Sequence, residues 1–215
     1  MRIKFENFWG GFPVHDNIIT VALKLRHRVE IVNDGADIIV CQGPRPHKDN
    51  NAVTISWFIE SMNRIGEPNY DNCDYSFNSC NLDDERNYRI PFWATQINWN
   101  NAPAHDINRG PTYYVSLEKL CNREISHREK LCCSVASGTL GKRADFYPAI
   151  SQRIDVAHGG DFLRNTAEMV EKSGNSDYLE KIEFISNFKS NLCFENDPRD
   201  GYVCEKILHA FYAGC

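Results

Sequence analysis

In the first half of the chain, hydrophobic residues fall in short continuous runs separated by Gly, Pro, Asn and Asp. Runs of this kind are typical of strands in a parallel sheet that is covered on both faces. At residues 18–26 apolar residues instead recur with helical spacing, after Asp16 and Asn17, which can cap a helix. This order predicts a Rossmann-like unit. Its predicted strands cover residues 2–5, 29–32, 37–41, 52–58, 74–77 and 88–92.

The pattern changes in the second half of the chain. Residues 94–111 show no period and contain many turn-forming residues, so we expect a long loop there. Residues 115–130 have the pattern of a charged amphipathic helix, and a second α/β unit begins at Leu131. The elements predicted for this unit are a strand at 131–137, helices at 144–150 and 179–188, a strand at 192–194 and a helix at 202–213, with an ambiguous pattern at 156–163.

These two halves predict an α/β fold of two Rossmann-like domains that face a cleft. The first domain would span residues 1–112, a connecting helix residues 113–130, and the second domain residues 131–215. Gly214 is well placed to end a helix, and a strand should follow that helix in such a unit. The sequence stops at Cys215 instead, so we expect the second domain to be incomplete and the chain to be C-terminally truncated.

Composition excludes several classes of protein. An apolar content of 42% can form real cores, and a net charge of −5 without a basic run argues against a nucleic-acid partner. No apolar stretch approaches the ~20 residues that span a bilayer, although peripheral contact with a membrane is left open. The N-terminus lacks the apolar region of a signal peptide. Nine cysteines without a C-x-x-C pair then favour reduced thiols in the cytoplasm.

Candidate chemistry is concentrated between residues 191 and 214. Glu195 and Asn196 follow an apolar strand, a turn rich in Asp, Pro and Gly comes next, and Glu205 and Lys206 fall in the first turn of a helix. In open α/β sheets such a crossover is where ligands bind. The free N–H groups and the positive end of the helix dipole favour an anion at this place.

The same stretch resembles the F-E-N…G-Y-x-T-E-K-I signature of the α-1,3/4-fucosyltransferases, which use GDP-fucose as donor. The likeness is carried by Phe194-Glu195-Asn196 and by residues 201–207, with Cys204 where that family usually has Thr. Three more segments are similar to the family. They are L-C-C-S-V-A-S-G-T-L-G-K-R-A-D-F-Y from Leu131, the D-Y…R-I-P-F part of residues 74–92, and T-I-S-W-F-I-E-S from Thr54.

This resemblance implies an inverting glycosyltransferase of the GT-B type that transfers fucose from GDP-fucose to a glycan hydroxyl. The acceptor it implies is a β-galactosyl-N-acetylglucosamine-type glycan. Transfer leaves negative charge on the departing diphosphate, which fixed cations stabilise, so no metal or other cofactor is expected. The residues that match the family's donor site are Arg143, Asn196, Tyr202, Glu205 and Lys206.

The acceptor hydroxyl must lose a proton as it attacks, and a carboxylate can take that proton as general base. The position that matches the family's proposed base is Glu60, at the end of a predicted buried strand. Glu67 is the competing candidate.

Two alternatives to fucose transfer stay open. The donor could be another nucleotide sugar, or the chain could be an inactive fragment or a glycan-binding remnant. Asp83-Asp84-Glu85 resembles a metal-binding cluster but is better explained as a solvated turn beside Arg86. We place four histidines in loop-like sequence without ligand spacing to one another: His15, His47, His105 and His158.

Overall fold

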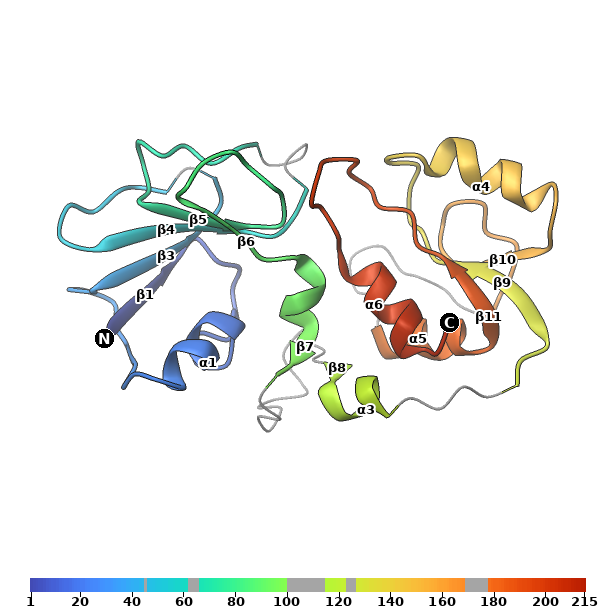
Figure 1. Cartoon of the computed structure of the whole chain (residues 1–215), viewed down its shortest axis with the longest axis horizontal. Helices are drawn as coiled ribbons and strands as arrows, with labels where there is room; N and C mark the ends of the chain where they lie inside the picture. The colour runs from blue at the N-terminus through green and yellow to red at the C-terminus, as the bar shows by residue number, and fades with distance from the viewer. Residues whose placement is uncertain (45, 62–65, 100–114, 123–126, 169–177) are drawn as a thin grey trace. The chain divides into compact units, whose positions relative to one another are not determined.

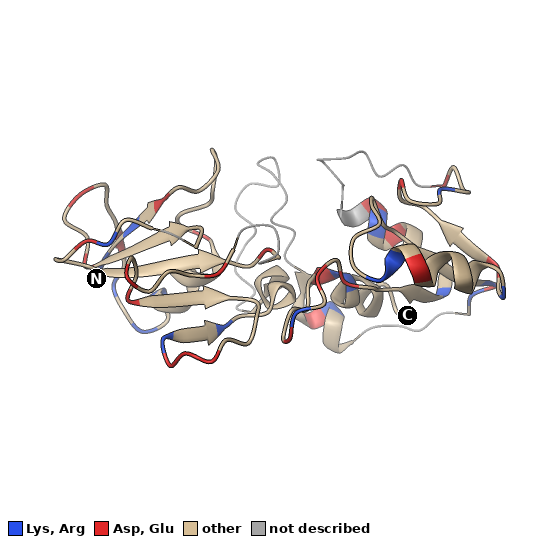
Figure 2. Ribbon diagram, turned by 90° about the horizontal axis from the view of Figure 1, so that it is seen from above, with Lys and Arg blue, Asp and Glu red and all other residues tan. Residues whose placement is uncertain are grey.

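The structure is a computed structural model that describes residues 1–44, 46–61, 66–99, 115–122, 127–168 and 178–215. These residues form two compact units, each of which is an α/β layer structure (Figure 1). Unit 1 contains the described residues of Met1–Thr95 together with Arg199–Tyr202. Unit 2 contains all the other described residues, including Val203–Cys215. Residues of both charge signs are interspersed over each unit (Figure 2).

Unit 1 is built on a six-stranded sheet with the order β2-β1-β3-β4-β5-β6, in which every neighbouring pair is parallel. The six predicted strands are confirmed, and the first five lie within one residue of their predicted ends. The last strand ends early, because Pro91 cannot donate to a ladder and the chain turns into a 3₁₀ helix at Phe92–Gln96. The strands are β1 (Arg2–Glu6), β2 (Glu30–Ile31), β3 (Ile38–Gln42), β4 (Val53–Phe58), β5 (Tyr75–Asn78) and β6 (Asn87–Arg89).

Helix α1 (Ile18–Lys24) covers one face of this sheet (Figure 1). Its predicted cap is confirmed, because the Asn17 side chain accepts hydrogen bonds from the backbone N–H groups of Ile19 and Thr20 at 3.1 and 3.0 Å. Ile19 carries the contact to the sheet, where it shares a buried cluster with Ile3 of β1 and Val40 of β3. The carboxyl ends of the strands are left to the loops.

Unit 2 has a three-stranded parallel sheet with the order β10-β9-β11. Its strands are β9 (Lys130–Ser134), β10 (Val156–His158) and β11 (Phe188–Leu192), and its main helices are α4 (Arg143–Ser151), α5 (Tyr178–Ser186) and α6 (Glu205–Tyr212). A separate two-stranded pair, β7 (Ile97–Asn98) with β8 (Val115–Ser116), precedes the short helix α3 (Leu117–Cys121). No helix in the described parts of either unit is long and apolar enough to cross a membrane.

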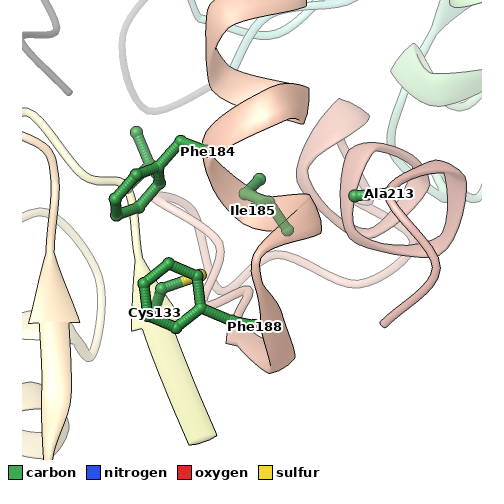
Figure 3. Close-up of a cluster of buried hydrophobic side chains, with 6 residues drawn as sticks. Cys133, Phe184, Ile185, Phe188 and Ala213 are labelled. Carbon is green, nitrogen blue, oxygen red and sulfur yellow. The ribbon is translucent and has the colours of Figure 1, made fainter. Parts of the chain in front are cut away.

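The core of unit 2 lies between the sheet and the helices α5 and α6 (Figure 3). Cys133 of β9 packs there against Phe184 and Ile185 of α5, and Ala213 closes the cluster at the end of α6. Because successive strand residues point to opposite faces, Ser134 faces the other side, where α4 lies. The sheet is therefore covered on both faces, as the apolar runs predict.

The helix expected over residues 115–130 is confirmed only at Leu117–Cys121 and is wrong from residue 127 onward. Helix α3 ends after Cys121, residues 123–126 lie outside the described range, and the chain is irregular from 127 to 129. A tertiary contact explains the irregular stretch: Arg128 is buried and donates to the carbonyl oxygens of Phe188 and Ala213. Its guanidinium thus satisfies a carbonyl oxygen that the end of α6 leaves without a helical partner. This tertiary contact, rather than the local helical pattern, accounts for the position of Arg128.

The strand expected at 192–194 is shifted. β11 covers Phe188–Leu192, so the helix before it ends at Ser186 and Phe194 already lies beyond the strand. This strand is defined by its hydrogen-bonded pairing with β9. Its middle residues are polar, so the strand has no apolar run from which the sequence could predict it. The helix expected from residue 202 begins at Glu205.

Ile185→Ala should lower the free energy of unfolding by about 2–5 kcal/mol, because Ile185 is fully buried in the core of unit 2. Ile207→Ala is the matched control, since Ile207 is also helical but 55% exposed, and it should change stability by no more than about 0.5 kcal/mol. Chemical denaturation followed by circular dichroism measures both. Equal losses in the two variants would contradict this core.

Candidate functional site

The loops that follow β9 and β11 meet at the carboxyl ends of these neighbouring strands. Gly141 shows how close they come: a Cβ atom there would lie 2.5 Å from the carbonyl oxygen of Glu195, and the residue has a positive φ of 68°. Glycine satisfies both conditions. The ring of Phe194 is held between the loops and α4, stacked on Phe146 at 5.2 Å and edge-on to Tyr147 at 5.5 Å.

Arg143 is the first residue of α4 and is 4% exposed, so it is not a surface charge. Its Nε and Nη2 both donate to the carbonyl oxygen of Phe194 at 3.1 Å. Among the described residues, Nη1 has no acceptor. Because a carbonyl cannot neutralise the guanidinium, Arg143 keeps a positive charge that an anion can complement.

Glu195 fastens the end of β11 to the start of α6. Its Oε1 accepts the backbone N–H of Cys204, the N-cap residue of α6, at 2.9 Å. Its Oε2 lies 2.7 Å from the Cys204 sulfur and 3.4 Å from Lys206 Nζ. Burial raises the pKa of the Cys204 thiol, so the sulfur keeps its proton and can donate to Glu195.

Glu205 is buried between two lysines. Its Oε1 lies 3.8 Å from Nζ of Lys181, which comes from α5, and 4.0 Å from Nζ of Lys206. Burial alone would raise the pKa of Glu205, but the charges of Lys206 and Lys181 outweigh it and lower the pKa to about 2. Burial likewise works against the charge of Lys206, and the carboxylate of Glu205 reverses that effect and raises the pKa of Lys206.

His209, one turn further along α6, does not add to the charge. Burial first, and then the charge of Lys181, lower its pKa to about 3, so the imidazole is neutral near pH 7. The charged side chains buried or half-buried around the start of α6 and the end of β11 are three cations and three carboxylates. They are Arg143, Lys181, Lys206, Glu195, Asp197 and Glu205. Arg143 and Lys206 are the cations that can donate to an anionic ligand.

Asn196 lies beside Gly141, and its Oδ1 is buried without a hydrogen-bond partner among the described residues. A buried acceptor left unsatisfied costs about 1–3 kcal/mol, and a ligand donor at this place would remove that cost. The structure thus brings Arg143, Asn196, Glu205 and Lys206 into one unit, at the carboxyl end of its sheet.

Tyr202 belongs to unit 1 instead, with the rest of the segment Arg199–Tyr202. Asn81 and Arg89 hold this segment: the Asn81 amide donates to Asp200 at 2.8 Å, and Arg89 donates twice to the carbonyl oxygen of Gly201. Gly201 has a positive φ of 78°, and a Cβ atom there would lie 2.8 Å from Arg89 Nε. The signature is therefore divided between the two units: Gly201 and Tyr202 belong to unit 1, and residues 194–196 and 203–207 belong to unit 2.

Glu60 lies just past the end of β4, exposed at the carboxyl edge of the sheet of unit 1. Glu67 is engaged elsewhere, since its Oε1 accepts from Arg199 Nη1 at 2.7 Å. The two carboxylates thus differ in surroundings, while residues 62–65 between them lie outside the described range.

His158 corrects one of the sequence predictions. It is the last residue of β10 and is buried rather than in a loop. Its Nδ1 lies 2.6 Å from Ser134 Oγ and its Nε2 2.8 Å from Ser151 Oγ, whose hydroxyl donates to the Tyr147 carbonyl. These contacts satisfy both ring nitrogens, so the serine–histidine arrangement is structural.

The acidic residues 83–85 and the remaining histidines match the sequence predictions, as far as they lie in the described ranges. Asp84 holds Arg86 through a 2.8 Å ion pair in an exposed turn, as expected for residues 83–85. His15 and His47 lie outside the helices and strands, and His105 falls outside the described range.

Lys181 is the residue that the sequence did not single out. It lies in α5, a helix that the sequence predicts from its apolar residues. A lysine in such a helix is ordinarily exposed to solvent. In the structure it is 5% exposed and faces Glu205. The available signal was weak: Lys181 directly precedes Ile182 and thus lies beside the apolar face rather than opposite to it.

Replacing Lys181 with Met should move acid unfolding to higher pH. The pKa of Glu205 is lowered in the folded state, from 4.5 to about 2, so its contribution to stability is present above the unfolded-state pKa and is lost as pH falls through the folded-state pKa. Without Lys181 the folded-state pKa rises and the loss comes earlier. At neutral pH, breaking this buried pair should cost about 3–5 kcal/mol.

Lys119→Met is the control, because Lys119 is an exposed lysine of helix α3 in the same unit. Its acid-unfolding midpoint, followed by circular dichroism, should match that of the parent. If Lys181→Met also matches the parent, Lys181 does not hold the charge of Glu205.

Comparison with known proteins gives one curated relative. No model of a known protein family matches the chain. The chain is 29% identical over 247 residues to the α-(1,3)-fucosyltransferase FucT of Helicobacter pylori. That match covers 99% of this chain and 48% of the relative, so the chain spans about half the length of the curated protein.

Solved structures agree with this result. A crystal structure of α1,3-fucosyltransferase with GDP-fucose matches with a TM-score of 0.65 and 24% identity, and one with GDP matches with 0.67 and 25%. Each match covers 99% of this chain and 65% of the solved chain. The α/β fold with parallel sheets is therefore that of the GT-B-like fucosyltransferases. Over almost its whole length the chain is thus similar to α-1,3-fucosyltransferases, and the segment that resembles their signature, residues 194–207, lies after the end of β11.

Proposed function

We propose that this chain serves an inverting transfer of fucose from GDP-fucose to a glycan hydroxyl. The observation that carries the proposal is that two cations largely removed from water, Arg143 and Lys206, lie beyond the carboxyl end of β11, within the segments that resemble the family. Two of the similar solved structures were determined with GDP-fucose or GDP. A nucleoside diphosphate is the kind of anion that such a site accommodates.

In this proposal Lys206 and Arg143 bind the diphosphate. As the bond from fucose to phosphate breaks, positive charge develops on the sugar ring and negative charge on the leaving oxygens. Cations that are already fixed in place stabilise the leaving group without reorganisation. Arg143 is fixed by the Phe194 carbonyl, and Lys206 by Glu195 and Glu205.

Glu205 and Asn196 would bind the remaining polar groups of the donor. The low pKa of Glu205 keeps its carboxylate ionised, so it can accept hydrogen bonds from ribose or fucose hydroxyls and favour positive charge on the sugar. The buried Oδ1 of Asn196 can accept from a nucleotide donor group. For Tyr202 the support is the family signature alone, because the structure assigns it to unit 1.

We assign the general base to Glu60. An exposed carboxylate at the carboxyl end of a parallel strand is placed where α/β sheets bind ligands. Glu67 is less suited, because Arg199 occupies one of its carboxylate oxygens.

Two further proposals concern the metal and the compartment. Protein cations take the role that a divalent metal has in other nucleotide-sugar sites, so donor binding needs no metal. The nine cysteines, all of which lie in the described ranges, form no disulfide, which supports a reducing compartment such as the cytoplasm.

GDP should protect the chain against thermal unfolding more than UDP does. At a hundredfold excess over its dissociation constant, a ligand stabilises the folded state by about 2.7 kcal/mol. EDTA should leave this protection unchanged. Equal protection by UDP would favour another nucleotide sugar, protection by neither would favour a fragment without donor binding, and loss on chelation would refute the metal-free site.

Lys206→Ala and Arg143→Ala should each weaken GDP binding by about 10–100-fold, the effect of losing one charge-assisted hydrogen bond. Arg143→Lys should recover only part of this loss, because a point charge replaces a fork of donors. Lys142→Ala is the matched control, since Lys142 is the exposed neighbour of Arg143. Calorimetric titration measures all four variants once circular dichroism has shown them folded, and parent-like affinity in both alanine variants would disprove the assignment.

Glu60→Gln should lower the rate of fucose transfer by about 10²–10⁴-fold, the usual contribution of a general base, while GDP affinity stays the same. Glu67→Gln, the control, should keep most of the activity. The opposite result in a transfer assay would move the base to Glu67. Full activity in both variants would place the base elsewhere.

A further inference from the structure

One turn of the signature segment lies in unit 1. Residues Arg199–Tyr202 belong to that unit, although Pro198 before them and Val203 after them belong to unit 2. The N–H of Tyr202 donates to the carbonyl oxygen of Arg199 at 3.2 Å, which closes the turn. The position of Tyr202 therefore depends on the residues of unit 1 that bind this turn.

Two residues of unit 1 bind the backbone of the turn. Nε and Nη2 of Arg89, at the end of β6, both donate to the carbonyl oxygen of Gly201, at 2.8 and 2.6 Å. Asn81 binds Asp200 twice, because its backbone N–H donates to the Asp200 carbonyl at 3.0 Å and its side-chain amide donates to Oδ2 at 2.8 Å. Two donors from one guanidinium fix the direction of the carbonyl as well as its distance. Most of these bonds reach the backbone, so they set the course of the chain rather than select a side chain.

Gly201 is the residue that this arrangement requires. It has a φ of 78°, a conformation that glycine adopts without strain. A Cβ atom there would lie 2.8 Å from both Arg89 Nε and the backbone nitrogen of Asn81. A third contact, between Arg199 and Glu67 at 2.7 Å, is an ion pair whose carboxylate is 62% exposed, and such pairs contribute little. Arg89 and Asn81 are therefore the main anchors of the turn.

The turn is closely connected along the chain to the proposed nucleotide site. Only Val203 separates Tyr202 from Cys204, the N-cap residue of α6. Glu195 accepts the N–H of that cap residue at 2.9 Å, and Lys206 follows in the first turn of the helix. A connection of two or three residues spans at most about 10 Å. A shift of the turn therefore has to change either the conformation of Val203 or the start of α6.

We propose that Arg89 and Asn81 are positioning residues for the nucleotide donor. They hold the turn in the conformation in which Tyr202 and the start of α6 bind GDP, and Arg89 acts through Gly201 rather than on the donor itself. The inference rests on the proposed function, which places GDP-fucose at the signature. A loop that is fixed before binding loses less conformational entropy when the ligand arrives. Without the two anchors, the ligand has to order the turn as well.

The exposure of the two anchors separates this role from a role in folding. Arg89 and Asn81 are exposed, whereas the core of unit 1 lies around the buried residues Ile3 and Val40. Substitution of an exposed residue ordinarily changes the free energy of unfolding little. Loss of either anchor should therefore lower the affinity for the donor while unit 1 stays folded.

The test is calorimetric titration of the whole chain with GDP. Arg89→Ala should weaken binding about tenfold, the fold-change that corresponds to the entropy of fixing one backbone residue. Without GDP, its thermal unfolding midpoint should stay within about 2 °C of the parent. Arg89→Lys should recover part of the affinity, because a point charge replaces a fork of donors. Asn81→Ala should also weaken binding, and it tests the proposal independently if Arg89→Ala is poorly folded.

Arg2→Ala is the matched control. Arg2 is another exposed arginine of unit 1, and its Nη2 donates to the carbonyl oxygen of Asp34 at 3.0 Å. The neighbouring Gly35 has a φ of 61°, and a Cβ atom there would lie 2.9 Å from Arg2 Nη1. Arg2→Ala therefore removes the same kind of contact from a different loop, and it should bind GDP like the parent.

Hydrogen exchange measured by mass spectrometry locates the effect. In Arg89→Ala without GDP, the amides of residues 199–204 should exchange faster than in the parent, while those of β9 should be unchanged. Exchange that rises equally in β9 would contradict a positioning role, because the variant would then be destabilised as a whole.

The titrations separate failure of this inference from failure of the proposed function. Parent-like GDP affinity in both Arg89→Ala and Asn81→Ala overturns the inference alone. An equal loss of affinity in Arg2→Ala also overturns it, because the effect would then not depend on the turn. If the parent itself does not bind GDP, the proposed function fails and the inference fails with it.

Discussion

The packing of α5 against α6 in unit 2 depends on one buried carboxylate. Glu205 has almost no access to water, and it stays ionised only because Lys181 and Lys206 lie on either side of it. The same carboxylate raises the pKa of Lys206 in a place where burial opposes charge. Residues from α5 and α6 are thereby held in register, since neither helix can move without exposing an unpaired charge. The groups that we propose to bind phosphate are thus held in place by the fold without a ligand.

Unit 1 obeys a different constraint, which is the parallel register of its sheet. Every strand ends at the same edge, so residues that are far apart in the sequence become neighbours without any contact between their side chains. The proposed base is placed in this way, just past the end of β4. Its position follows from strand pairing, and for this reason the sequence pattern was informative about it.

Local patterns predicted most of the fold. The strands of unit 1, the cap of α1 and the position of Glu205 in the first turn of α6 follow from apolar runs and capping residues. The errors occur where a distant contact decides the local structure. The charged stretch up to Lys130 has a helical pattern, yet residues 127–129 are irregular. There Arg128 is buried and donates to carbonyl oxygens at the start of β11 and the end of α6.

The candidate site shows the same limit. The signature pointed to Arg143, Asn196, Glu205 and Lys206, and the structure brings these residues together. Spacing along the chain could not show that Arg143 is buried, that Lys181 faces Glu205, or that His158 is enclosed by two serines. Each of these facts depends on which helix covers which face of a sheet.

The division of the signature at Tyr202 has a consequence for how such proteins can be recombined. The segment Arg199–Tyr202 is held by Asn81 and Arg89, although the residues on both sides of it belong to the other unit. A chimera that takes its N-terminal half from a relative therefore replaces Asn81 and Arg89 but keeps the segment Arg199–Tyr202 that these two residues hold. Modular exchange is restricted to partners that keep an amide and a guanidinium at these two positions. In this respect the N-terminal and C-terminal halves of the chain have to be exchanged together.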